Sequence, residues 1–192
     1  MKLADLEHLS PYRLTQGQSL FRTQRAAVAG GTLARGPLHL APAGSLSGRF
    51  DLADVPCAYL AEEPDTALFE AIFRRESTGV SIAALQLREL LAVQTRAEVV
   101  LGDLRPHAAA WPVLQSLRFS ETQALAEEAY QAGLGGFIYR SAQHFSQDCV
   151  VLFDPDRAAT KELWRVALAN QQGLVNRWVA DATRRSRVPL VP

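Results

Sequence analysis

The sequence has few cysteines, no excess charge of either sign and no long hydrophobic run. Its 192 residues include two cysteines, and twenty basic residues balance twenty acidic ones. A chain of zero net charge has no overall field to attract nucleic acid or anionic lipid, so an anionic ligand must be held by local charge. No apolar stretch is long enough to cross a bilayer. These absences favour a ligand pocket and argue against direct binding of nucleic acid or membrane.

The two cysteines, Cys57 and Cys149, lie far apart, and each sits in an apolar run. This arrangement fits buried thiols better than a disulfide scaffold. Residues 1–18 lack the charged segment and apolar core of a secretory signal, and we interpret them as an N-terminal extension. We therefore expect a reducing compartment, the cytoplasm.

Length and composition predict one globular domain. A chain of 192 residues can bury roughly 70% of the surface that its unfolded form exposes. Hydrophobic residues make up 48% and charged residues 21%, the balance of an ordinary globular protein. The four histidines are scattered, and neither a histidine pair at helical spacing nor a CxxC motif occurs. The sequence therefore predicts no metal site.

Hydrophobic periodicity predicts strands and helices that are interleaved without a regular rhythm. Strands are expected at 19–24, 49–51, 57–62, 79–87, 90–95, 97–104, 137–142 and 149–153. Helices are expected at 64–76 and 120–132, the second with Ser120 as N-cap and Gly133 as C-terminal glycine, and a long C-terminal helix at 157–186. This pattern favours a single-domain α+β fold.

The connection from residue 26 to residue 48 is rich in glycine and proline, which predicts a loop. Structureless connections longer than about 12–15 residues tend to be functional or disordered. We therefore expect this segment to line or cover a site.

Three side chains between residues 48 and 70 are not required by packing: Arg49, Tyr59 and Glu70. Each has an ordinary interpretation. Glu70 and Arg74 could form a surface ion pair at i,i+4 spacing, worth about 0.3–0.5 kcal/mol. Arg49 could be a surface arginine, and Tyr59 a half-buried strand tyrosine. Their joint occurrence suggests a shared site.

At these residues the chain resembles the RES-domain toxins, a family named for an arginine, a glutamate and a serine. The resemblance follows short motifs over most of the chain: SLFR (19–22), GRFD (48–51), AYLAEEPDTALFE (58–70), QALAEEAYQAGLGGFIYRSA (123–142) and CVVLF (149–153). The spacing of Arg49, Tyr59, Glu70 and Ser141 matches the family. His144 and the turn at 145–148 depart from the glycine- and asparagine-rich turn of relatives, so no role is carried over to that turn.

The resemblance implies a fold similar to ADP-ribosyltransferases and an enzyme that splits NAD between nicotinamide and ribose. It implies a toxin that depletes NAD, held inactive by an antitoxin with a helix-turn-helix DNA-binding part. Water, inorganic phosphate or a protein side chain could accept the ADP-ribosyl group, so a protein ADP-ribosyltransferase stays an alternative. A non-catalytic NAD- or ADP-ribose-binding module and a plain interaction protein are further alternatives.

The chemistry of this reaction suits each residue type. A guanidinium at Arg49 would clamp a phosphate or an amide carbonyl, and Tyr59 would stack on the nicotinamide ring. The Glu70 carboxylate would stabilise positive charge that develops on the ribose in the transition state. Ser141 would orient the nicotinamide or the ribose, unless it only ends a strand. Arg22 would assist with phosphate, unless it is an exposed strand arginine.

The expected C-terminal helix carries an apolar stripe that usually faces a core. The stripe consists of Trp164, Leu168, Leu174, Val175 and Trp178. Any exposed part of it would be the natural place for a second copy of the chain or an antitoxin to dock.

Overall fold

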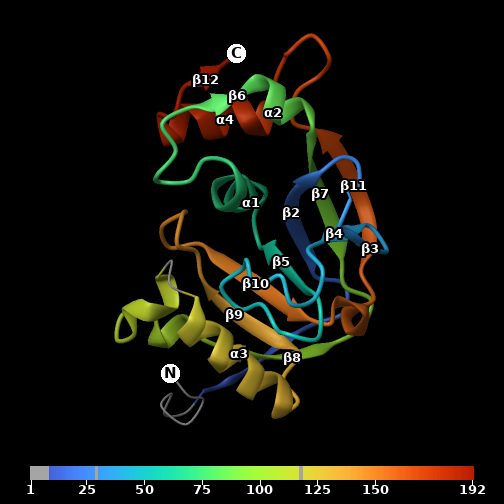
Figure 1. Ribbon diagram of the computed structural model, residues 1–192, viewed down its shortest axis with the longest axis vertical. Helices are drawn as coiled ribbons and strands as arrows, with labels where there is room; N and C mark the ends of the chain where they lie inside the picture. The colour runs from blue at the N-terminus through green and yellow to red at the C-terminus, as the bar shows by residue number, and fades with distance from the viewer. Residues whose placement is uncertain (1–8, 29, 117–118) are drawn as a thin grey trace.

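The centre of the molecule is a mixed sheet of eight strands, ordered β1-β8-β9-β10-β5-β2-β7-β11 (Figure 1). This computed structural model describes residues 9–28, 30–116 and 119–192. The strands of the sheet are β1 (Pro11–Leu14), β2 (Ser19–Arg25), β5 (Cys57–Ala61), β7 (Arg88–Gln94), β8 (Val99–Asp103), β9 (Gly136–Arg140), β10 (Asp148–Phe153) and β11 (Lys161–Ala167). Neighbouring strands are antiparallel except β8 and β9, which are parallel.

Short helices and two small sheets surround this centre. The α-helices of the described residues are α1 (Pro64–Ala71), α2 (Ile82–Gln86), α3 (Ser120–Gln131) and α4 (Arg177–Ser186). The small sheets pair β3 (Leu33–Arg35) with β4 (Leu38–Leu40), and β6 (Val80–Ser81) with β12 (Leu190–Val191). Figure 1 shows α2 and α4 together at the end that carries the C-terminus, with α3 at the opposite end. Within the described ranges, no helix is both long and apolar enough to cross a bilayer.

The central strands are buried on both faces. In β10, Val151 belongs to the hydrophobic cluster on one face, whereas Val150 and Leu152 belong to the cluster on the other. Successive residues of a strand point to opposite faces, so a strand covered on both sides reads as a continuous apolar run. This explains the uninterrupted CVVLF segment and confirms the single-domain α+β class.

The structure confirms strands at most of the expected places, and α3 begins and ends near its expected bounds. Gly133, with φ of 89°, follows the end of α3 as expected for a C-terminal glycine. Ser120 is the first helical residue rather than the N-cap, which is Phe119 and makes no side-chain capping hydrogen bond. The first helix is shorter than expected, because α1 ends at Ala71.

The prediction of one long helix at 157–186 is wrong. This segment contains a 3-10 turn (Pro155–Ala158), then strand β11, and only then α4. Half-buried and exposed residues alternate along β11, which is strand periodicity. Trp164 of β11 and Trp178 of α4 stack with ring centroids 5.2 Å apart. Apolar residues that belong to two different elements therefore had the sequence spacing of one helix face.

Three further expectations are corrected. The proposed extension at 1–18 is wrong for Pro11–Leu14, because this segment forms β1 and pairs with β8, while residues 1–8 lie outside the described part. The segment 79–87 is mostly helical, because it contains α2 (Ile82–Gln86). Ser81 caps this helix by accepting a hydrogen bond from the Ala84 amide. Residues 49–51 form a tight loop rather than a strand.

Both cysteines are free and buried, as predicted. Burial raises the pKa of Cys57 to about 12 and that of Cys149 well above its ordinary value. The thiolate is the reactive form, so both thiols stay protonated and unreactive near pH 8. We expect iodoacetamide to modify neither cysteine in the folded protein and both after denaturation, as read by intact mass. Rapid alkylation of the folded protein would contradict the buried placement.

Candidate functional site

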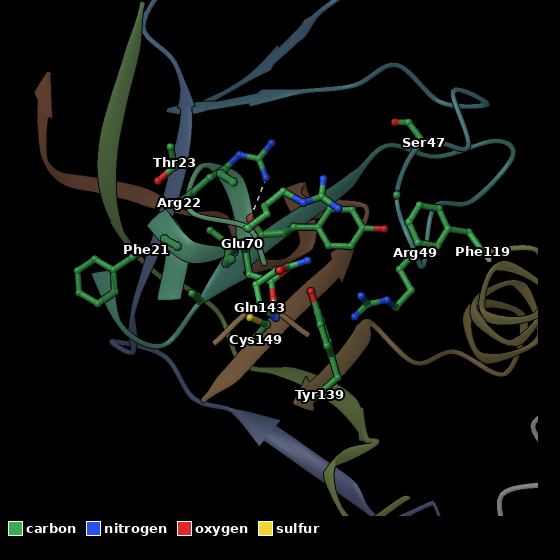
Figure 2. A pocket seen from close by; sticks show the side chains of 17 residues that line it. Phe21, Arg22, Thr23, Ser47, Arg49, Glu70, Phe119, Tyr139, Gln143 and Cys149 are labelled. Atoms are coloured by element: carbon green, nitrogen blue, oxygen red, sulfur yellow. Dashed lines mark hydrogen bonds between the residues drawn. The ribbon is translucent and has the colours of Figure 1, made fainter. Parts of the chain in front are cut away.

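A cavity of about 280 Å³ lies beside β2, β5 and α1 (Figure 2). Its charged lining consists of the side chains of Arg22, Arg49, Arg74 and Glu70. Three guanidinium groups against one carboxylate favour an anionic ligand. Four aromatic residues also line the cavity: Phe21, Tyr59, Phe119 and Tyr139.

The structure brings together four of the five residues singled out in the sequence. Arg22 comes from β2, Arg49 from the loop before β5, Tyr59 from β5 and Glu70 from α1, and all four line this one cavity. Ser141 is buried behind the wall and reaches the cavity through Glu70. Arg22 and Tyr59, 37 positions apart in the chain, share one site because β2 and β5 are neighbours in the sheet.

The loop that presents Arg49 is locked onto Tyr59. The Tyr59 hydroxyl donates to Asp51 Oδ1 at 2.9 Å and accepts from the Phe50 amide at 2.8 Å. Asp51 Oδ2 accepts from the Gly48 amide at 2.6 Å. A Cβ at Gly48 would lie 2.5 Å from the Tyr59 hydroxyl, so this close approach requires glycine. Burial raises the pKa of Tyr59 well above its ordinary value, so the hydroxyl stays a neutral donor.

Helix α3 holds the same loop from the other side. The Thr122 hydroxyl donates to the Arg49 carbonyl at 2.5 Å, and the side-chain amide of Gln123 donates to the Gly48 carbonyl at 2.9 Å. Arg49 itself is only 8% exposed, and its Nε has no hydrogen-bond partner. Within the described part of the chain, no acidic side chain pairs with Arg49, which leaves its guanidinium available to an anion.

One oxygen of Glu70 is fixed by the turn after β9. Its Oε1 accepts from the Ser141 hydroxyl at 2.5 Å, from the Ala142 amide at 3.1 Å and from the Gln143 amide at 3.3 Å. The alternative surface pair with Arg74 is absent, because α1 ends at Ala71 and Arg74 pairs with Glu76 at 2.7 Å. Glu70 is therefore anchored by one oxygen and lines the cavity, an arrangement that fixes where its negative charge lies.

Ser141 is only 4% exposed and does not line the cavity. Besides donating to Glu70, its hydroxyl oxygen accepts from the Gln143 amide at 3.1 Å and the His144 amide at 2.8 Å. In this structure Ser141 thus holds Glu70 and the turn together.

Replacing Ser141 with alanine removes a donor to a charged acceptor. Such hydrogen bonds are worth about 1.5–3 kcal/mol, so we expect kcat of the reaction proposed below to fall about 10- to 100-fold with KM nearly unchanged. Steady-state kinetics checks this, with Ser45→Ala, an exposed serine outside the cavity, as the control. Equal kcat in the two variants would contradict the positioning role.

Arg22 is engaged with backbone on both terminal nitrogens. One donates to the Tyr59 carbonyl at 2.7 Å and the other to the His39 carbonyl at 3.1 Å. Burial lowers its pKa from the ordinary value. The Gln24 side chain also binds the hairpin, accepting from the His39 amide at 3.0 Å. Arg22 therefore ties the β3–β4 hairpin to β5 at the cavity wall.

The turn at 141–147 is clamped from both sides. The His144 ring stacks on Phe69 of α1 with centroids 4.4 Å apart, and its Nδ1 lies 2.8 Å from the Thr66 hydroxyl. At the base of the turn, Arg140 pairs with Asp148 at 2.6 Å. The turn that fixes Glu70 is thus rigidly held, which gives His144 a structural place that the sequence did not reveal.

Among the residues that the structure describes, no group of three histidine, cysteine or acidic side chains is placed to hold a metal ion. The charged and phenolic groups available in the cavity are three arginines, two neutral phenols and one fixed carboxylate.

The fold is α+β, and its mixed sheet carries an arginine-lined cavity with one fixed carboxylate. Comparison of the sequence with protein-family models identifies the family. The family model described as RES domain matches residues 11–171, which is most of the chain. The chain belongs to the RES domain family.

Among solved structures, the chain is similar to the MbcT toxin in the crystal structure of the M. tuberculosis MbcT–MbcA toxin–antitoxin complex. The TM-score is 0.60 at 15% sequence identity, and the alignment covers 81% of this chain and 86% of that chain. At this identity the likeness shows the fold. A comparison with curated protein sequences finds no match.

Proposed function

We propose that this protein cleaves NAD at the bond between nicotinamide and ribose. The observation that carries the proposal is the shared cavity, where Arg49, Tyr59 and Glu70 meet from three separate segments. Membership of the RES domain family supports it, because the RES-domain toxins that the sequence resembles act on NAD.

The cavity suits each part of the dinucleotide. The pyrophosphate carries two negative charges, and the guanidinium of Arg49 offers a planar set of donors to it. The ring of Tyr59 offers an apolar face for nicotinamide, while its hydroxyl is occupied by Asp51. Glu70 supplies the only carboxylate in the described lining, and in the proposed complex its negative charge would lie beside the ribose.

The reaction breaks the bond between C1 of the ribose and the ring nitrogen of nicotinamide. The bonding electron pair leaves with nicotinamide and neutralises its ring charge, and the ribose gains oxocarbenium character. The fixed Glu70 carboxylate stabilises this positive charge, which develops only in the transition state. A nucleophile then bonds to C1. Attack by water gives ADP-ribose and a proton, and attack by phosphate gives ADP-ribose with a phosphate on C1.

The test is to incubate purified protein with NAD and to separate the products by chromatography. We expect nicotinamide and one ribosyl product in equal amounts. Parallel reactions with inorganic phosphate and with cell extract assign the acceptor, and labelled protein in the extract would favour protein ADP-ribosylation. Binding of NAD without nicotinamide release would contradict the enzyme and favour the binding module.

We further propose that the enzyme is the toxin of a toxin–antitoxin pair, with an antitoxin that carries a helix-turn-helix part. The structural neighbour MbcT is a toxin seen in complex with MbcA, which supports such a partner. Expression in bacteria should arrest growth and lower the NAD pool, and co-expression of the cognate antitoxin should prevent both. Growth arrest with an unchanged NAD pool would contradict this proposal.

A further inference from the structure

Phe119 is an aromatic residue of the cavity wall that contributes to neither hydrophobic cluster. It lines the cavity and is partly exposed, and the clusters on the two faces of the sheet do not include it. Among the described residues it has no stacked or edge-on aromatic partner. Phe21, by contrast, packs against the core, with its ring centroid 6.0 Å from that of Trp164. Phe119 is therefore a partly exposed aromatic residue of the cavity wall that no other aromatic ring of the described residues covers.

Phe119 and Arg49 are fixed relative to each other by one buried hydroxyl. The Thr122 side chain, which is fully buried, donates to the Arg49 carbonyl at 2.5 Å and lies 3.0 Å from the Phe119 carbonyl. The backbone amide of Gln123 also donates to the Phe119 carbonyl at 2.8 Å. The backbones that carry this aromatic ring and this guanidinium are thus held together by the first turn of α3.

The order of Glu70, Arg49 and Phe119 along the cavity matches the order of ribose, pyrophosphate and adenosine in the dinucleotide. Figure 2 shows Phe21 and Phe119 at opposite ends, and the guanidinium of Arg49 between Glu70 and Phe119. If Glu70 lies at the ribose that loses nicotinamide and Arg49 at the pyrophosphate, the next group beyond Arg49 is the adenosine.

We propose that Phe119 forms a subsite that stacks on the adenine base of the substrate. This inference rests on the proposed function, because it takes the position of the ribose from Glu70. Stacking on an aromatic ring depends little on the identity of the base, because every base has a π face. The subsite therefore selects a dinucleotide over a mononucleotide and discriminates weakly between purines.

The inference is tested by titrating ADP-ribose and nicotinamide mononucleotide into two proteins in which Glu70→Gln slows turnover. One carries Glu70→Gln and the other Glu70→Gln with Phe119→Ala. Loss of one base–aromatic stack should raise the Kd of ADP-ribose about 10- to 100-fold. The Kd of nicotinamide mononucleotide, which lacks adenine, should not change. Phe119→Trp should restore tight binding of ADP-ribose.

Phe145 offers a matched control, since it is 82% exposed and does not line the cavity. Phe145→Ala in the same background should leave the Kd of ADP-ribose unchanged. If Phe119→Ala reduces folding, Phe119→Leu keeps the volume without the π face and should show the same weakening.

Three outcomes overturn the inference: an unchanged Kd of ADP-ribose in the Phe119 variants, an equal loss for both ligands, or no ADP-ribose binding at all. The proposed function is judged separately, by nicotinamide release from the protein with Glu70 intact. If the protein with Glu70 intact releases nicotinamide but Phe119→Ala leaves the Kd of ADP-ribose unchanged, the adenine subsite is refuted and the proposed function is not.

Discussion

Replacing Glu70 with glutamine should lower the rate of nicotinamide release from NAD about 100- to 1000-fold, the range observed when one preorganised electrostatic group is removed. The substitution removes the negative charge but keeps an oxygen that can accept the hydrogen bond of Ser141. The fold should therefore be retained, and the thermal unfolding midpoint should stay close to that of the wild type. Initial rates measured by chromatography, with a thermal melt of each protein, check both parts.

Glu63→Gln is the matched control for this variant. Glu63 is exposed, stands at the opposite end of α1 and does not line the cavity. It should keep the wild-type rate. A Glu70→Gln enzyme as active as the Glu63→Gln enzyme would mean that Glu70 is not the stabilising charge.

Replacing Gly48 with alanine should have the second largest effect. The new Cβ would lie 2.5 Å from both Asp51 Oδ1 and the Tyr59 hydroxyl, and 2.8 Å from the Tyr59 ring. These groups are locked to one another, so the loop must move and take Arg49 with it. A catalytic group displaced by about 1 Å can cost about 100-fold in rate, and overpacking costs about 1–3 kcal/mol of stability. Kinetics and urea unfolding measure the two effects.

Gly30→Ala is the control for this change. A Cβ at Gly30 meets nothing within 4 Å. It should alter neither rate nor stability, since the backbone there is not in the left-handed region. If Gly48→Ala behaved like Gly30→Ala, the loop would not be the rigid support that the hydrogen bonds indicate.

The sequence pointed to three residues that the structure brings to one cavity, but not to the contacts that hold them there. Arg49, Tyr59 and Glu70 were found through short motifs with fixed spacing. Thr122 lies 73 positions from the carbonyl that it binds, and a lone buried threonine in a helix carries no local signal of such a contact. Asp51 belongs to the GRFD motif, but its bonds to Tyr59 and Gly48 depend on a loop shape that periodicity does not encode.

The fold was predictable where strands are buried on both faces. The apolar run of β10 could be read directly, whereas α2, a helix of five residues, is too short for helical periodicity to emerge. The prediction of one long helix in the C-terminal region was wrong for a different reason. Trp164 and Trp178 pack together across β11 and α4, so a tertiary contact between two elements had the spacing of one helix face.

The long segment at 26–48 was expected to line or cover a site, and its end does so. Ser47 and Gly48 line the cavity, and the hairpin within the segment is bound by Arg22 through the His39 carbonyl. Arg22 thus connects this segment to the strand that carries Tyr59. Its predicted contact with phosphate stays a prediction, because its two terminal nitrogens already donate to backbone carbonyls.

A crystal structure of the Glu70→Gln variant with NAD tests the central claim most directly. The account predicts nicotinamide against the ring of Tyr59, the adjoining ribose beside the side chain at position 70, and the pyrophosphate on the guanidinium of Arg49. NAD bound elsewhere, or bound in this cavity with its phosphates remote from Arg49 and its nicotinamide remote from Tyr59, would contradict the account.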